Sequence, residues 1–317
     1  MNIPRRTLLM VLRVAVLGLV GLFVWRTVAR AWGSLSGAEL AIRPEWALAA
    51  ALVYVVGMAP MAWYWGLVLR AFGQPHKARV VVPAYYYGNL GKYVPGKAMV
   101  VVLRTAAVRT AGGDAGPIAA SVFVETLTFM AVGGAMAAGL LAFSDGPAWH
   151  STLAALIAVG CALPTLPPVA NPIMLRLVGK RLRPDHPPVR ITWAAALAGW
   201  PAACLAWCVI AVSLQCVIRC CSSSVSPFDL SGYVTCLKAA TLPVVAGFLS
   251  MIPGGAGVRD ALMLEMLAPR FGAETALVAA AATRLIWVIT EAGLCGILWT
   301  TVRSAPAPTA DQQTPKP

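Results

Sequence analysis

Charged residues are scarce in this chain, and their scarcity decides its class. Only 12% of the 317 residues are Asp, Glu, Lys or Arg, whereas 59% are hydrophobic and the mean hydropathy is +0.75. Soluble globular proteins carry about 25% charged residues. The composition therefore excludes an ordinary soluble protein. It predicts an all-α integral membrane protein with a single polytopic domain at residues 1–300 and a disordered tail at 301–317.

Acidic residues are even fewer than basic ones. Twelve Asp and Glu stand against 25 Lys and Arg, so the formal net charge is +13. A basic stripe interleaved with aromatic residues would indicate nucleic acid. Here the Lys and Arg are scattered between apolar runs, so we expect no nucleic-acid partner. Their places follow the positive-inside rule and predict a multi-pass protein of the inner (cytoplasmic) membrane with both termini in the cytoplasm.

Residues that hold metals are also few. The chain has three His and eight Cys. Four cysteines lie within apolar runs, where buried thiols are common: Cys161, Cys204, Cys208 and Cys295. Four others gather near one predicted outer loop, where a disulfide and free thiols are both open alternatives: Cys216, Cys220, Cys221 and Cys236. The sequence predicts no metal and no cofactor.

Long apolar runs predict six transmembrane helices. The runs cover residues 8–25, 46–69, 117–143, 152–169, 191–218 and 273–299. Basic segments mark the cytoplasmic side; one contains Arg104 and Arg109, and the strongest lies between Arg176 and Arg190. For the run at 8–25, a cleavable signal peptide is the alternative.

Two other apolar stretches are interrupted by helix-breaking residues. In the first, at 80–102, about 15 residues precede the break and would span roughly 20 Å as a helix, which is less than the roughly 30 Å of the hydrocarbon core. The second runs from 234 to 267. We expect each to form a re-entrant helical hairpin. The predicted re-entrant turns contain Pro95, Gly96, Pro253, Gly254, Gly255 and Gly257.

These stretches occupy equivalent places in two halves of the chain. Residues 46–143 and 191–299 each consist of a span, a hairpin and a span. Glu125 follows Pro95 by about 30 positions, and Arg284 follows Pro253 at nearly the same distance. Because the two units begin on opposite sides, they predict inverted repeats, a common plan of secondary transporters that places the binding site near the bilayer midplane.

The expected ligand is an anion, because helix N-termini and cations lie near the two breaks. The candidate residues for binding a lipid head group are Lys92, Tyr93, Lys97, Glu125, Arg259, Asp260 and Arg284. A charge at mid-bilayer costs at least about 2.5 kcal/mol, so an embedded Arg without a purpose is unfavourable. Two alternatives stay open. Lys92 and Lys97 could extend to the cytoplasmic interface, and Arg284 could form a structural pair with Glu291 or with Glu125.

At these residues the sequence resembles the integral membrane domain of the lysylphosphatidylglycerol synthase family. The resemblance rests on the segment from Lys92 to Lys97 with Arg104 behind it, on the segment from Pro253 to Asp260, and on Arg284. The family often has Glu in place of Asp260. The resemblance implies a multi-helix fold with paired re-entrant segments and translocation of a lipid with a charged or glycosylated head group. Bifunctional relatives carry a soluble aminoacyl transferase domain, which is not expected here because the chain stops at Pro317.

Three functions therefore remain to be compared. The first is flippase-like translocation of an anionic or glycosylated lipid, of phospholipid, polyprenyl-phosphate or hopanoid type, without enzymatic turnover. The second is a membrane-embedded transferase acting on a polyprenyl phosphate, for which Glu125, Asp260 and Glu265 are the nearest carboxylates. The third is a non-catalytic subunit of an envelope-biosynthesis enzyme. The expected partner is a lipid with a phosphate-containing head group, and the sequence leaves the oligomeric state open.

Overall fold

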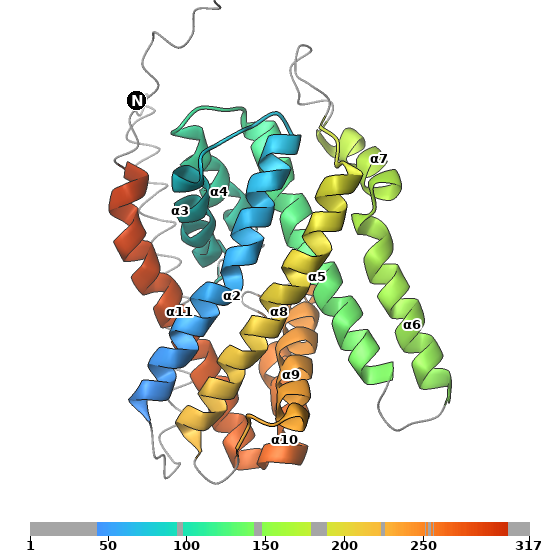
Figure 1. Ribbon diagram of the computed structural model, residues 1–317, viewed down its shortest axis with the longest axis vertical. Helices are drawn as coiled ribbons and strands as arrows, with labels where there is room; N and C mark the ends of the chain where they lie inside the picture. The colour runs from blue at the N-terminus through green and yellow to red at the C-terminus, as the bar shows by residue number, and fades with distance from the viewer. Residues whose placement is uncertain are drawn as a thin grey trace, which may run out of the picture.

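The computed structural model describes residues 43–93, 98–142, 148–178, 189–222, 226–250, 252, 255 and 257–303. This part of the chain is almost entirely helical and contains no strand (Figure 1). Several predictions fall outside it: the first span at 8–25, the residues Pro95, Gly96, Lys97, Pro253 and Gly254, and the tail from residue 304. The helices are α2 (Pro44–Ala71), α3 (Ala78–Asn89), η1 (Leu90–Tyr93), α4 (Ala98–Arg109), α5 (Ala115–Ala142), α6 (Ala148–Ala162), η2 (Leu163–Thr165), α7 (Pro167–Val178), α8 (Trp193–Cys221), α9 (Leu230–Leu249), α10 (Val258–Phe271) and α11 (Ala273–Arg303).

Five described helices are long and apolar enough to cross a membrane, which confirms the all-α membrane class. They are α2, α5, α8, α9 and α11. The pair Ser151–Thr165 and Pro167–Arg176, bent by 55°, would be a sixth span if counted as one. The bend falls where the prolines of the sequence predict a break.

Helix α9 differs from its prediction as a short hairpin arm. The arm was expected to begin at residue 234, but Asp229 caps the helix by accepting a hydrogen bond from the amide of Gly232 at 3.1 Å, so that α9 begins at Leu230. The added turn gives 20 residues, or about 30 Å, which equals the thickness of the hydrocarbon core. By length and composition α9 therefore qualifies as a span.

The centre of the molecule is formed by α2, α5 and α8. Helices α2 and α8 lie side by side along most of their length in Figure 1. Glycine permits the close approach: a Cβ on Gly57 would lie 3.2 Å from Ile210, and one on Gly133 would lie 2.7 Å from the Trp207 ring. Trp207 also stacks on Phe129 with ring centroids 4.2 Å apart. This tight core holds the long helices in fixed positions.

Helices α3 and α4 form a short antiparallel pair. Each has 12 residues, which span about 18 Å, so neither can cross the bilayer alone. Gly91 allows the pair to close, because a Cβ at this position would lie 2.7 Å from the Cα of Val100. The pair occupies the upper end of Figure 1, where α2 ends and α5 begins.

Helices α9 and α10 form a second antiparallel pair at the lower end of Figure 1. Arg270, near the end of α10, donates to both carboxylate oxygens of Asp229 at 2.6 and 2.7 Å and to Ser231 at 3.0 Å. The start of α9 and the end of α10 are therefore joined. Desolvation raises the pKa of the Asp229 carboxyl, but the hydrogen bonds from Arg270 and Gly232 outweigh it and lower that pKa below its ordinary value.

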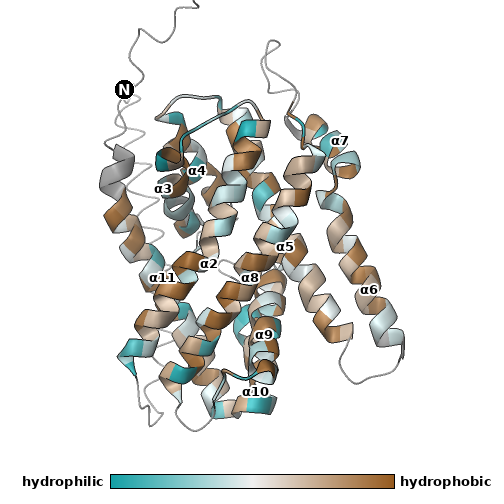
Figure 2. Ribbon diagram, viewed as in Figure 1, coloured by the Kyte–Doolittle hydropathy of each residue, from teal (hydrophilic) through white to brown (hydrophobic). Residues whose placement is uncertain are grey.

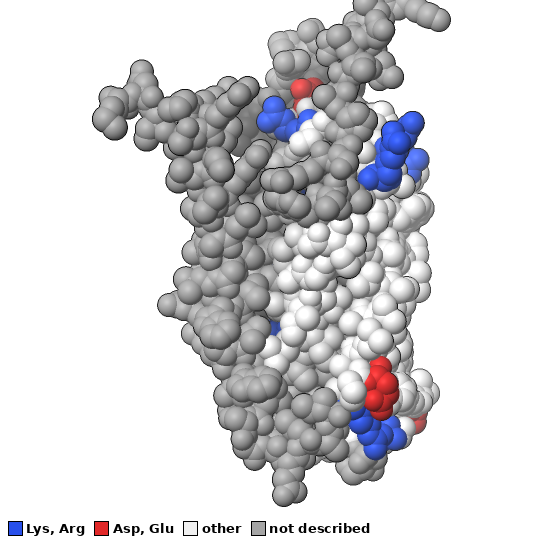
Figure 3. All heavy atoms as spheres, turned by 90° about the vertical axis from the view of Figure 1, so that its left-hand side faces the viewer, with Lys and Arg blue, Asp and Glu red and all other residues white. Residues whose placement is uncertain are grey.

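The outer surface is that of a membrane protein. Apolar residues predominate along the middle of the helices in Figure 2, and Figure 3 shows charged side chains gathered at the two ends of the described surface. Large apolar side chains such as Leu52, Leu197 and Ile289 are more than half exposed. All eight cysteines are free thiols, so the disulfide alternative for the four near the outer loop is not realised.

Candidate functional site

Two polar clusters lie among the described helices. The Glu291 cluster consists of Tyr54 on α2, Lys92 on η1, Arg259 on α10, and Trp287 and Glu291 on α11. The Glu125 cluster consists of Trp65 on α2, Tyr85 and Asn89 on α3, Arg104 on α4, and Glu125 on α5. The Glu125 cluster joins the α3–α4 pair to the long helices α2 and α5, whereas the Glu291 cluster brings η1 and α10 together with α2 and α11.

Glu291 is the centre of the first cluster. Its carboxylate is only 3% exposed. Lys92 Nζ lies 2.5 Å from Glu291 Oε1, and the Tyr54 hydroxyl donates to the same oxygen. Lys92 also donates to the Tyr54 hydroxyl at 3.0 Å. The other oxygen, Glu291 Oε2, has no hydrogen-bond partner among the described residues.

Aromatic rings line the same cluster. Tyr54 stacks on Trp287 with centroids 4.7 Å apart and an interplanar angle of 15°. The Trp287 indole donates to Ser213 at 3.2 Å, which fixes the ring against α8. The guanidinium of Arg259 lies 4.7 Å from the centre of the Trp287 ring, within the range of a cation–π interaction. Thus η1 and α10, which belong to different helix pairs, each contribute a cation to one aromatic stack.

Arg259 lies in the first turn of α10. Gly257 is the N-cap with φ of 84°, a left-handed conformation that glycine adopts without strain. Asp260 accepts from the amide of Gly257 at 3.1 Å and forms an ion pair with Arg284 at 3.0 Å. Through these two contacts Asp260 caps α10 and restrains Arg284. Arg259 Nη2 is buried without a hydrogen-bond partner among the described residues.

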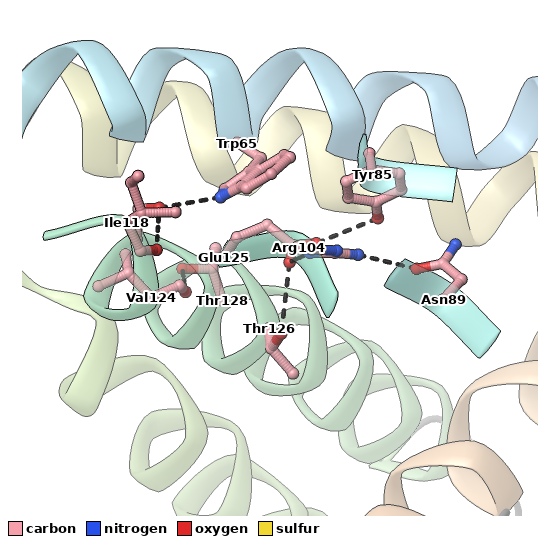
Figure 4. Close-up of polar contacts among 10 residues, drawn as sticks. Trp65, Tyr85, Asn89, Arg104, Ile118, Val124, Glu125, Thr126 and Thr128 are labelled. Carbon is pink, nitrogen blue, oxygen red and sulfur yellow. Dashed lines mark hydrogen bonds and ion pairs between the residues drawn. The ribbon is translucent and has the colours of Figure 1, made fainter. Parts of the chain in front are cut away.

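The Glu125 cluster is a fully buried ion pair (Figure 4). Arg104 and Glu125 are each 2% exposed, and their nearest atoms are 2.5 Å apart. Arg104 also donates to Asn89 at 2.8 Å, and its guanidinium lies 3.9 Å from the centre of the Tyr85 ring. The Tyr85 hydroxyl donates to the second oxygen of Glu125 at 3.1 Å. The ion pair therefore joins α3, α4 and α5.

The predicted site residues separate into three groups. Lys92 and Arg259 belong to the Glu291 cluster, and Tyr93 lies beside it, with its ring 5.2 Å from Lys92 Nζ. Asp260 and Arg284 pair with each other next to Arg259. Glu125 lies in the other cluster, and Lys97 is outside the described residues.

Two interpretations of the sequence are wrong. Arg104 was taken to mark the cytoplasmic surface, but Glu125 neutralises it inside the protein. The alternative in which Arg284 pairs with Glu291 or Glu125 is also wrong: Glu291 binds Lys92, and Arg284 binds Asp260. Residues seven apart do share a helix face, but partners from other helices lie nearer.

Tyr54 and Trp287 were not among the predicted site residues, and Glu291 was considered only as a structural partner of Arg284. Tyr54 lies within an ordinary apolar run, and nothing in its neighbours distinguishes it. Trp287 was recognisable, because Arg284, Trp287 and Glu291 follow at helical spacing on one face of the last span. Among the described residues, no group of three or more His, Cys, Asp and Glu could hold a metal ion.

The comparison with known families agrees with the resemblance seen in the sequence. The family model described as the lysylphosphatidylglycerol synthase TM region matches residues 10–293, most of the 317 residues. The chain belongs to this family. The matched region of this lysylphosphatidylglycerol synthase family member includes both polar clusters and the α3–α4 and α9–α10 pairs. No curated protein matches the chain.

Proposed function

We propose that this protein is flippase-like and translocates a lipid with an anionic or glycosylated, phosphate-containing head group between leaflets. The observation that carries the proposal is that two cations lie at one aromatic stack: Lys92 pairs with the buried Glu291 carboxylate beside Tyr54, and Arg259 lies over the Trp287 ring that stacks on Tyr54. Burying a cationic side chain inside the membrane costs free energy. Such side chains therefore occur mainly where they bind a substrate or an ion, or where they pair with an acidic side chain. A phosphate is the ligand that Arg259 and the start of α10 suit best.

The α3–α4 and α9–α10 pairs support an alternating-access mechanism, in which the binding site opens to one side of the membrane at a time. In this proposal α3 and α4 form a re-entrant hairpin. Helices α9 and α10 form the equivalent pair of an inverted repeat, which enters from the opposite membrane face and whose first helix, α9, is long enough to cross the core. Lys92 of η1 and Arg259 at the start of α10 both lie in the Glu291 cluster, so a movement of one repeat against the other would open the cluster to either side in turn. We propose no enzymatic step. An envelope-biosynthesis enzyme is the candidate protein partner.

The upper end of Figure 1 is proposed to face the cytoplasm of a cell with an inner membrane. The ends of α2, α4 and α7 and the starts of α3 and α8 lie there, and exposed basic residues mark these helix termini: Arg70, Lys77, Arg79, Arg109, Arg176 and Arg190. Residues at the lower end carry both signs, for example Arg270 and Asp229. A single cysteine at position 114 or 183 should then resist impermeant reagents added to intact cells, whereas one at 145 or 223 should react. Labelling of position 183 from outside intact cells would show that the proposed topology is wrong.

The proposed function is tested by reconstitution into liposomes that carry a fluorescent phosphatidylglycerol in both leaflets. Bleaching by an external reductant should remove about half of the fluorescence in protein-free liposomes and nearly all of it when lipids exchange between leaflets. The lipid should be recovered chemically unchanged. A chemically changed lipid would favour the transferase. If half of the fluorescence stays protected and the lipid is unchanged, the assay is repeated with a polyprenyl-phosphate-linked probe. The same result with that probe would favour a subunit without transport activity.

A further inference from the structure

Two polar atoms of opposite kind lack partners in the Glu291 cluster. Glu291 Oε2 can only accept a hydrogen bond, and Arg259 Nη2 can only donate one. Neither has a hydrogen-bond partner among the described residues, although the Glu291 side chain is 97% buried. The Tyr93 side chain also interacts with Glu291, but its hydroxyl does not complete a hydrogen bond to Oε2. Buried polar atoms in folded proteins almost always find partners. A pair of such atoms indicates a ligand that supplies one acceptor and one donor.

The two side chains lie at the same part of α11. Trp287 and Glu291 are four residues apart on α11, which places them on the same face about one helical turn from each other. Arg259 lies over the Trp287 ring. Lys92 is already neutralised by Glu291 at 2.5 Å, whereas Arg259 forms no ion pair with a described carboxylate. Arg259 is therefore the cation available to a phosphate.

We propose that Glu291 recognises a hydrogen-bond donor on the lipid head group while Arg259 binds its phosphate. The inference rests on the proposed function and narrows its substrate class. The class comprises phospholipids whose head group carries a hydroxyl or an ammonium group beyond the phosphate. Head groups that end in methyl groups are excluded from it.

The physical reason is the cost of leaving a buried carboxylate oxygen unpaired. A head group with a donor satisfies Glu291 Oε2, whereas a methylated head group removes water from this oxygen and gives nothing in return. Sites built to bind a donor discriminate strongly against analogues that lack it. Overall charge plays no part in this selection, so probes of equal charge can isolate it.

The test compares leaflet exchange of two matched pairs of fluorescent lipids in the same proteoliposomes. Phosphatidylglycerol and phosphatidylmethanol both carry one negative charge, but only the first has hydroxyl donors. Phosphatidylethanolamine and phosphatidylcholine are both zwitterionic, but only the first has an ammonium donor. We expect the donor-bearing lipid to exchange at least about tenfold faster in one pair or both, and the pair with the larger ratio identifies hydroxyl or ammonium as the group that Glu291 binds. Ratios near one in both pairs would overturn the inference while leaving the proposed function intact.

A variant tests whether Glu291 causes the difference in exchange rate between the donor-bearing and the donor-free lipid. In Glu291→Gln the carbonyl oxygen replaces Oε1, because Lys92 and Tyr54 donate to that position, and the NH2 group replaces Oε2. A donor then stands where the lipid donor would bind, so the donor preference should fall to about one even if all rates decline. Glu274→Gln makes the same change at an exposed position of α11 and should keep the wild-type ratio. If Glu291→Gln does not fold, Lys92→Met with Glu291→Gln leaves no unpaired charge and serves instead. A donor preference that survives in either variant would overturn the assignment, and a wild type that exchanges no lipid would overturn the proposed function as well.

Discussion

Replacing Arg104 by Leu should lower the free energy of unfolding by about 3–5 kcal/mol, which is the usual effect of removing one partner of a buried ion pair. The substitution leaves the Glu125 carboxylate, 2% exposed, as an uncompensated charge. It also removes the hydrogen bond to Asn89 and the contact with the Tyr85 ring. Unfolding of the purified protein in detergent, followed by circular dichroism against temperature and denaturant, measures the loss.

A double substitution separates the unpaired charge from the lost packing. Arg104→Leu together with Glu125→Leu should recover most of the stability, because apolar residues of similar volume often replace a buried ion pair without loss. Arg109→Leu changes an exposed residue at the end of the same helix and should alter the stability by less than about 0.5 kcal/mol. A double variant as unstable as the sum of the single ones would contradict this account of the Glu125 cluster.

Replacing Arg259 should slow lipid translocation more than any other single change at the Glu291 cluster. Arg259→Ala removes a charge-assisted hydrogen bond to phosphate, worth about 1.5–3 kcal/mol, so we expect a decrease of about 10- to 150-fold. Arg259→Lys keeps the charge but loses the planar donor pair and the stacking on Trp287, and it should decrease the rate by up to about tenfold. Leaflet exchange at matched amounts of reconstituted protein gives both values.

The fold should survive both changes, because Arg259 forms no ion pair with a described residue and its removal leaves no carboxylate unpaired. Arg190→Ala and Arg190→Lys, at an exposed position before α8, are the matched controls and should exchange lipid at the wild-type rate. Equal rates for wild type, Arg259→Lys and Arg259→Ala would show that the phosphate binds elsewhere.

The sequence predicts the elements of this structure better than their contacts. Apolar runs show where helices lie, because the bilayer requires about 20 apolar residues for each span. Partners across the fold carry no such local mark. Lys92 and Glu291 are 199 positions apart, and Tyr54 and Glu291 are 237 apart. Arg104 shows the limit most clearly: a lone Arg after an apolar run is typical of a cytoplasmic boundary, and only the fold reveals that Glu125 neutralises it.

The spacing of the ion pairs along the chain also orders the events of biosynthesis. When α4 leaves the ribosome it carries an Arg that the bilayer core disfavours, and its partner follows only 21 positions later, in α5. The Arg of α4 can therefore be neutralised as soon as α5 emerges. Lys92 must wait for the last helix of the chain. A ribosome-bound intermediate that lacks α11 would leave this ammonium group without its carboxylate. A membrane chaperone or quality-control protease could recognise the unpaired charge and so distinguish the unfinished chain from the finished one.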